Sequence, residues 1–465
     1  MKKKKKMLLI LSVLLVIGIA AYIILSGTGA DEAGEIIVKE TKPEEIQSIV
    51  LKTKGNTFTF VKEGGEWAYR EDKTFPLNPA YTESLEKGVS QVKADRIIAE
   101  NRLNEKEYGL DEPQSTVTAE TRGGERFHIY IGDQNPVTSY YYICCDGDER
   151  IYSVSSTYAE RFCRSILDMA SLEVANGELN IADVRSINAE CGEEKFSLQY
   201  LEDSSGVFYD KNVHWFVNEG GEYSASSERT AKELKDRLTT LSFEKCAAYR
   251  PTEEEIVQYG IDTPRASLEM RFLLDGSEEV MKIVIGKEIT EENGEGDEKR
   301  FTYVYNVRRN AVYLDKSEDI AELLKLSADG MKSLQVCSAE FADLESAAFK
   351  TADVTHTVEI KHSEKKGKAA YVLNGWATED ERIWRILYDV TSMEADMLAA
   401  KDDVFFDVPT VGDLTVWLEK RDGTKIKAEY YNYDENFYLA TVNGSGRFLV
   451  NRKYVEALME SIKAL

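Results

Sequence analysis

A six-residue motif that occurs twice is the feature that most limits how this chain can fold. Residues 108–113 read Tyr-Gly-Leu-Asp-Glu-Pro, and residues 259–264 read Tyr-Gly-Ile-Asp-Thr-Pro, 151 positions further on. A pair of strands with alternating apolar residues follows each copy and ends in Ile-Gly, at residues 131–132 and 285–286. A fixed order of motif and strands that returns along the chain predicts a fold unit that is itself repeated.

The motif and its surroundings divide the chain into three units. A helix is predicted before each motif copy, over residues 78–92 and 227–241, and a further helix over residues 156–169 closes the first unit. A third and more divergent copy keeps only Asp407 and Pro409 of the motif. The predicted fold class is α+β, with an N-terminal transmembrane helix followed by three tandem α+β repeats whose sheets are mainly antiparallel. The predicted segments are a basic tail (1–6), an anchor (7–25), a linker (26–44) and the three repeats (45–172, 173–338 and 339–465).

The residue types of the motif indicate a turn and not a ligand site. Gly109 and Gly260 are expected to take a positive φ, which a β-carbon would penalise. Asp111 and Asp262 are expected to bond the backbone two residues on, as Asx turns. A proline restricts the residue before it to extended backbone and so starts the next strand. The predicted motif residues are Tyr108, Gly109, Asp111, Pro113, Tyr259, Gly260, Asp262, Pro264, Asp407 and Pro409.

On these motifs the chain resembles a bacterial envelope family known as the domain of unknown function 4340. The resemblance covers residues 45–330 closely and residues 340–465 weakly, because the third copy lacks the glycine of the motif and the glycine at the strand end. It implies a membrane-anchored, exported repeat protein that serves as an accessory subunit, for example of an ABC-type transport system. It supplies no catalytic residue to carry over.

The N-terminus begins with a run of lysines, Lys2 to Lys6, followed by an uncharged stretch from Met7 to Leu25. As a helix this stretch would be about 28 Å long, close to the thickness of a bilayer core. The flanking lysines place that end in the cytoplasm. We therefore expect a single-pass signal anchor in the lipid bilayer, with the rest of the chain outside the cytoplasm. A cleaved signal peptide is the alternative, since residues 26–30 are small.

The charge balance excludes one class of function. The chain has a net charge of −25, and without the five N-terminal lysines 53 basic residues face 83 acidic ones, a balance of −30. A general nucleic-acid binder needs lysine and arginine to neutralise phosphates, so no nucleic acid is expected as a partner. A solvated acidic surface is the simplest interpretation.

Little in the sequence points to catalysis, metal binding or a cofactor. The chain has four histidines, His128, His214, His356 and His362, and no metalloprotease, nucleophile-elbow or Walker motif. Two acidic loops, 146–149 and 291–298, lack the spacing of a calcium loop and are expected to be solvated turns. The cysteines show no metal-ligand spacing; disulfides among them are possible outside the cytoplasm, and the sequence does not choose a pairing. We expect most of them to be buried small hydrophobic residues: Cys144, Cys145, Cys163, Cys191, Cys246 and Cys337.

These observations predict a binding or assembly module of the envelope with no enzyme activity, whose partner is a membrane-protein complex. An envelope hydrolase or a wall-polymer-binding protein is the first alternative, and a deep pocket that joins His128 or His214 to acidic groups would favour the hydrolase. Tyrosine-rich strands such as residues 140–142 fit core packing better than sugar binding. A passive structural spacer is the second alternative.

Overall fold

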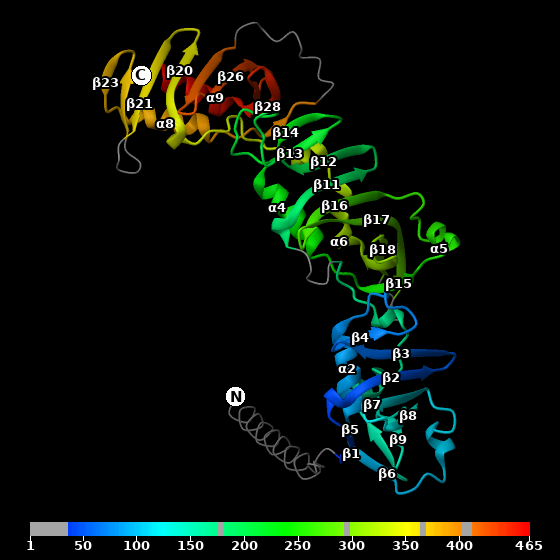
Figure 1. Ribbon diagram of the computed structural model, residues 1–465. Coiled ribbons are helices and arrows are strands. Elements are labelled where there is room, and N and C mark those ends of the chain that lie inside the picture. Colours follow the sequence, from blue (N-terminus) through cyan, green and yellow to red (C-terminus); the bar gives the residue numbers. More distant parts are fainter. Residues whose placement is uncertain (1–35, 175–179, 293–297, 363–368, 401–411) are drawn as a thin grey trace, which may run out of the picture. The chain divides into compact units, whose positions relative to one another are not determined.

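The computed structural model describes residues 36–174, 180–292, 298–362, 369–400 and 412–465 (Figure 1). The chain divides into two compact units. The first unit ends at Leu172 and also takes in Lys245–Tyr249, and the second unit holds Glu173–Glu244 and Arg250–Leu465.

The first unit is built on an eight-stranded antiparallel sheet with the order β4-β3-β2-β7-β8-β9-β10-β6. Its strands are β2 (Ile46–Thr53), β3 (Asn56–Glu63), β4 (Glu66–Tyr69), β6 (Arg96–Ala99), β7 (Ser115–Thr121), β8 (Arg126–Gln134), β9 (Tyr141–Cys145) and β10 (Ile151–Val154). A separate pair is formed by β1 (Ile36–Glu40) and β5 (Gln91–Ala94). The strand β15 (Lys245–Tyr249) also belongs to this unit.

The helix α2 (Pro79–Ser90) packs on this sheet and confirms the helix predicted over residues 78–92. The Asn78 side chain caps it by accepting a hydrogen bond of 3.0 Å from the Ala80 N–H. Leu85 and Val89 share one helix face and are fully buried in the core of the unit. The helix predicted over residues 156–169 is wrong in extent: α3 ends at Glu160, and a separate 3-10 turn follows at Leu167–Met169.

The second unit contains two more antiparallel sheets. One has the strand order β14-β13-β12-β11-β16-β17-β18-β19, and the other is nine-stranded with the order β23-β22-β21-β20-β25-β26-β27-β28-β24. The strands of the former are β11 (Val184–Cys191), β12 (Glu194–Tyr200), β13 (Trp215–Glu219), β14 (Glu222–Ala225), β16 (Ala266–Leu274), β17 (Ser277–Glu292), β18 (Glu298–Asn306) and β19 (Ala311–Lys316). The strands of the latter are β20 (Leu344–Thr351), β21 (Thr355–His362), β22 (Ala369–Leu373), β23 (Trp376–Thr378), β24 (Met397–Leu398), β25 (Leu414–Lys420), β26 (Lys425–Asn432), β27 (Phe437–Val442) and β28 (Ser445–Asn451).

Short helices accompany both of these sheets. They are α4 (Glu228–Thr239), α5 (Glu253–Gln258), α6 (Ser317–Ala321), α7 (Ala328–Met331), α8 (Glu381–Thr391) and α9 (Arg452–Lys463). Helices α8 and α9 bury their apolar sides, including Ile383, Leu387 and Val455, in the core of the third sheet.

The three large sheets share one connectivity. In each, the first strand of the sheet along the chain pairs with a strand that lies beyond the helix, as β2 with β7, β11 with β16, and β20 with β25. The second and third sheets each carry one strand more at the outer edge, β14 and β23, than the first sheet, which ends at β4. The predicted boundaries of the three repeats stay a prediction.

The predicted fold class, α+β repeats behind an N-terminal transmembrane helix, needs correction. Antiparallel strands in four sheets dominate the described residues, because hairpins extend each large sheet while the helices stay short. The longest helices that are described have twelve residues, about 18 Å, and none is long and apolar enough to cross a membrane. The span predicted over residues 7–25 lies outside the described residues, and the transmembrane signal anchor is not retained.

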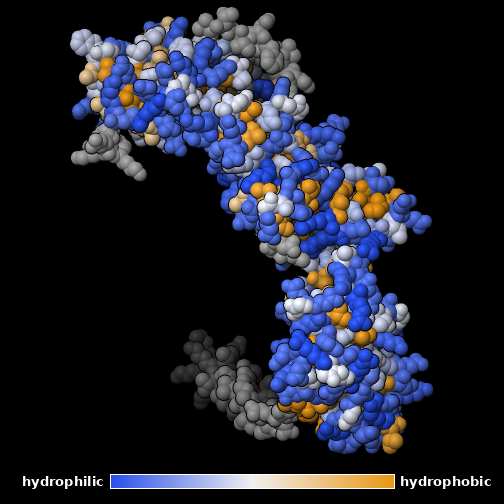
Figure 2. Space-filling view, viewed as in Figure 1, coloured by the Kyte–Doolittle hydropathy of each residue, from blue (hydrophilic) through white to orange (hydrophobic). Residues whose placement is uncertain are grey.

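The cysteines are packed in the interior, and the visible surface is mostly polar. All six cysteines are free thiols; five are buried and Cys163 is half-buried, so packing accounts for them. Burial raises the pKa of Cys144 to about 12, which keeps that thiol protonated. The face seen in Figure 2 is largely hydrophilic, with scattered apolar patches.

Candidate functional site

The repeated motif forms a close contact between a turn and a neighbouring strand, which we call the clamp. Gly109 has φ 66° and Gly260 has φ 68°, the left-handed values expected of them. The turn then lies directly on a glycine within the second strand of the hairpin, Gly132 in β8 and Gly286 in β17. A Cβ added at Gly132 or Gly286 would overlap the carbonyl oxygen of the motif tyrosine. In each copy, the glycine of the turn and the glycine of the strand therefore allow the two backbone segments to come into close contact.

The motif tyrosines pack on the tyrosine-rich strands of their own sheets. The Tyr108 ring meets Tyr142 edge-on, with centroids 4.8 Å apart. The Tyr259 ring lies 4.5 Å from that of Tyr303. Aromatic contact thus covers the outer face of each sheet beside the clamp, which is a packing role.

The remaining motif residues do not come together as a site. Asp111 and Asp262 are exposed, and their side chains make no hydrogen bond in the described part of the chain, so the predicted Asx turns are wrong. Pro113 and Pro264 each stand two residues before a strand, β7 and β16 respectively. Asp407 and Pro409 lie outside the described residues.

The histidines are held by neighbouring groups and are not gathered at a reactive centre. His128 Nδ1 lies 2.6 Å from Asp146 Oδ2, and both side chains are partly exposed. His214 Nδ1 lies 3.0 Å from the Leu201 carbonyl oxygen. Neither histidine lines the cleft described below. The described residues contain no group of three or more histidine, cysteine and acidic side chains that could hold a metal ion.

The first acidic loop forms a turn with Gly147 and Glu149 exposed, as predicted, but its Asp148 carboxylate is bonded by neighbouring side chains. Arg150 donates two hydrogen bonds to the Asp148 carboxylate, at 2.9 and 2.8 Å. The Tyr152 hydroxyl donates a third, at 2.6 Å. The hydrogen bonds from Arg150 have the largest effect, and together with that from Tyr152 they hold the pKa of Asp148 well below its usual range. The second loop falls largely outside the described residues.

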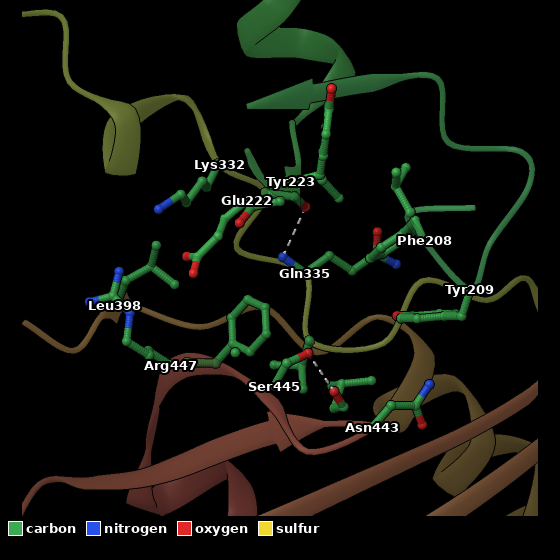
Figure 3. A pocket seen from close by; sticks show the side chains of 18 of the residues that line it. Phe208, Tyr209, Glu222, Tyr223, Lys332, Gln335, Leu398, Asn443, Ser445 and Arg447 are labelled. Carbon is green, nitrogen blue, oxygen red and sulfur yellow. Dashed lines mark hydrogen bonds between the residues drawn. The ribbon is translucent and has the colours of Figure 1, made fainter. Parts of the chain in front are cut away.

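A hollow lies inside the second compact unit, where the second and third sheets meet. Its volume is about 890 Å³, within the range of ligand sites. Residues from both sheets and from the segment between them form its walls (Figure 3). They come from the loop after β12 (205–209), the hairpin of β13 and β14, the linker after α7, the short strand β24 and the hairpin of β27 and β28. We call this hollow the inter-sheet cleft.

Apolar and aromatic side chains make up much of the wall of the inter-sheet cleft. Phe208 packs edge-on against Phe216 of β13, with centroids 5.7 Å apart, which fixes the loop to the sheet. Leu398 and Phe448, from the strands β24 and β28 of the third sheet, also line the cleft. Val207 is 39% exposed at the rim. The cleft therefore offers apolar surface to side chains of a partner.

A network of charges closes one end of the inter-sheet cleft. Lys332 Nζ lies 2.5 Å from Glu219 Oε2 and 2.7 Å from Asp329 Oδ1, and Arg447 Nη2 lies 3.2 Å from the same Asp329 oxygen. Burial favours the neutral acid, but the hydrogen bond from Lys332 and the two positive charges keep the pKa of Asp329 below its usual value. Glu222 is exposed at the cleft and has no ion pair among the described residues.

A buried polar contact holds the loop after β12 on the third sheet. Asp210 Oδ1 lies 3.1 Å from Lys420 Nζ of β25, and both side chains are less than a tenth exposed. The Ser338 hydroxyl donates to Asp210 Oδ2 at 2.8 Å, and the Ser338 N–H donates to the Tyr209 hydroxyl at 2.9 Å. This contact sets the position of the loop that forms one wall of the cleft.

The inter-sheet cleft was not foreseen from the sequence. Its strand β14, Glu-Tyr-Ser-Ala, is too short and too polar to give a strand pattern. One feature of the sequence, a long connection between two strands, could have indicated this region. Fourteen residues, 201–214, join β12 to β13, whereas two residues join the corresponding strands β3 and β4. An insertion of this kind within one repeat points to a local function.

Comparison with known proteins supports the resemblance for part of the chain. Residues 67–211 match the family described as Domain of unknown function (DUF4340). The predicted resemblance is confirmed over this segment. The DUF4340 segment runs from β4 to the loop that borders the inter-sheet cleft. The chain matches no curated protein and no solved structure at a significant level.

Proposed function

We propose that this protein is a binding module without enzyme activity, which holds an extended segment of a partner protein in the inter-sheet cleft. The observation that carries the proposal is that β14, the outermost strand of the second sheet, forms part of the cleft wall. An outermost strand offers unpaired backbone groups to an added strand, a common mode of peptide recognition.

The hydrogen bonds of β14 show which of its backbone N–H and carbonyl groups could pair with an added strand. Ser226 N–H donates to the Trp215 carbonyl at 2.9 Å, so the bonds toward β13 fall on alternate residues, including Ser224. The N–H and carbonyl of Tyr223 therefore face away from β13. The carbonyl of Ala225, which also points away from β13, accepts a hydrogen bond of 2.8 Å from the Ser333 N–H. Tyr223 is thus the residue of β14 at which a partner strand would pair.

The side chains around the cleft favour a particular kind of segment. Apolar walls at Val207, Phe208 and Leu398 suit apolar side chains that point alternately from an extended chain. Glu222 suits a lysine or arginine, in keeping with the net charge of −25. We therefore propose an extended segment that combines apolar residues with a basic one. The ABC-type transport components implied by the resemblance are the first partners to test.

The other functions have less support. A hydrolase needs a reactive group beside the histidines, and the His128–Asp146 pair does not line the cleft. A passive spacer does not need a cleft of this volume with an outermost strand in its wall.

Site-specific crosslinking tests the proposal in cells that express the full chain. A photoreactive amino acid at Val207, on the cleft rim, is expected to link to one protein through a single segment. The control position is Val257 on α5, which is 61% exposed and lies away from the cleft. Identical products from both positions, or no product from Val207, would contradict the proposal.

A further inference from the structure

The open face of the third sheet carries a second hollow, of about 370 Å³, beside Trp417. Val416 and Leu418 on either side of Trp417 point into the core and are buried, so Trp417 lies on the opposite face of β25 and is 37% exposed. Across the strand pair it faces Ala348, whose small side chain leaves the space beside the indole.

The repeated sheets show that the fold does not require a tryptophan at this place. The equivalent pair on the first sheet is Val50 with Thr118. On the second sheet it is Asn188 with Glu269, joined by a hydrogen bond of 3.3 Å between their side chains. A polar residue therefore serves this position in two sheets out of three. The large exposed ring of the third sheet needs a reason other than folding.

Polar side chains surround the indole, and their charges balance. Glu359 of β21, Glu419 of β25, and Lys425 and Lys427 of β26 line the hollow. Lys425 Nζ is 3.6 Å from Glu419 Oε1, a loose and exposed pair that a ligand can replace. Thr357 adds a hydroxyl. A hollow with an apolar floor and a balanced polar rim fits an uncharged ligand with many hydroxyl groups.

A peptide fits this hollow less well than a sugar does. Strand β25 is internal, because it pairs with β20 on one side and with β26 on the other. Its backbone groups are used in the sheet, so recognition must go through side chains alone. An aromatic ring that stacks on the C–H face of a sugar, with polar groups at its edge for the hydroxyls, works in this way.

We propose that the Trp417 hollow binds an uncharged sugar ring of an oligosaccharide. This proposal does not depend on the proposed function of the inter-sheet cleft. The indole supplies the stacking surface, and Glu359, Glu419 and the two lysines exchange their present partners for sugar hydroxyls. Binding through one ring and a few hydrogen bonds predicts a weak interaction, with Kd values on the order of 0.1–1 mM.

Calorimetric titration of the full chain with chitotetraose, cellotetraose and maltotetraose tests the proposal. At least one is expected to bind, and Trp417→Ala is expected to weaken its binding about tenfold or more. Trp384→Ala is the matched control, because Trp384 on α8 is an exposed tryptophan, 45% accessible, outside the hollow. Tyr223→Pro in the inter-sheet cleft is expected to leave sugar binding unchanged, which separates the two proposals.

Three results would overturn the sugar site. They are no heat with any of the three sugars, equal binding by the wild type and Trp417→Ala, or equal loss in Trp384→Ala. Thermal unfolding of each variant accompanies the titrations. If Trp417→Ala lowers the melting temperature, Trp417→Phe is used, since it keeps an aromatic ring and is expected to keep part of the binding.

Discussion

Asp210 and Lys420 form an ion pair of 3.1 Å that is almost completely buried between the second and third sheets. Two hundred and ten positions separate them in the chain. A buried charge is costly to leave alone, so each residue depends on the other and on the Ser338 hydroxyl. The pair fixes the loop that borders the inter-sheet cleft, and so links the packing of two repeats to the proposed site.

Removal of one partner is expected to be worse than removal of both. Lys420→Met leaves the Asp210 carboxylate buried without its counter-charge, and should lower the free energy of unfolding by about 3–5 kcal/mol. Adding Asp210→Asn should restore part of this loss. Urea unfolding of both single variants and the double variant measures the effect. The control is Lys425→Met, at an exposed pair, which should change stability by less than about 1 kcal/mol. Additive losses in the double variant would argue against coupling.

The clamp predicts a sharp difference between two glycines of the same hairpin. Gly132→Ala places a Cβ against the Tyr108 carbonyl, and should cost about 1–3 kcal/mol. Gly123→Ala has its nearest neighbouring atom at 3.7 Å and should change stability by no more than about 0.5 kcal/mol. Thermal and urea unfolding compare the two. Equal stability of both variants would show that the turn does not need the close approach.

Asp315 is expected to make stability depend on pH. Burial raises its pKa to about 6, and the nearby Asp319 and Glu244 act in the same direction. Its ordinary value is about 3.9, so the folded protein binds the proton more tightly than the unfolded chain does. The contribution is therefore greatest below about pH 4, falls as the pH rises, and is fully lost above about pH 6.

Asp315→Asn removes this charge, and should be more stable than the wild type by about 1–2 kcal/mol at pH 7 and no more stable at pH 4. Unfolding at a series of pH values measures the difference. Asp262→Asn, which makes the same substitution at an exposed carboxylate, is the control. A constant difference between Asp315→Asn and the wild type at all pH values would contradict the assignment.

The cysteines should behave as packed thiols. The six are free, and burial raises the pKa of Cys246 to about 12 and that of Cys163 to about 11. Alkylation of the native protein should be slow, with Cys163 first because it is the one that is half-buried. Mass spectrometry before and after unfolding should count six modified thiols only in the unfolded sample. Protected pairs after unfolding would indicate disulfides.

The repeated motif made much of the fold predictable, and local patterns made helix α2 predictable. Asn78 and Pro79 mark the start of that helix, and Leu85 and Val89 repeat at its spacing. The α+β balance and the helix over 156–169 were wrong because apolar spacing over a short stretch does not separate helix from irregular packed chain. The cleft was not predictable, because contacts such as Asp210–Lys420 join distant residues that no local pattern relates.

The central claim, that the outermost strand in the inter-sheet cleft pairs with a partner, is tested most directly by changing one backbone N–H. Tyr223→Pro removes an N–H that faces away from β13, so the sheet should survive. Tyr223→Phe keeps the N–H and is the matched control. Calorimetry measures the affinity of each variant for a synthetic peptide that covers the segment crosslinked from Val207. We predict that Tyr223→Pro weakens binding about tenfold or more while Tyr223→Phe binds within about twofold of the wild type. Equal affinities of all three proteins would contradict strand pairing at β14.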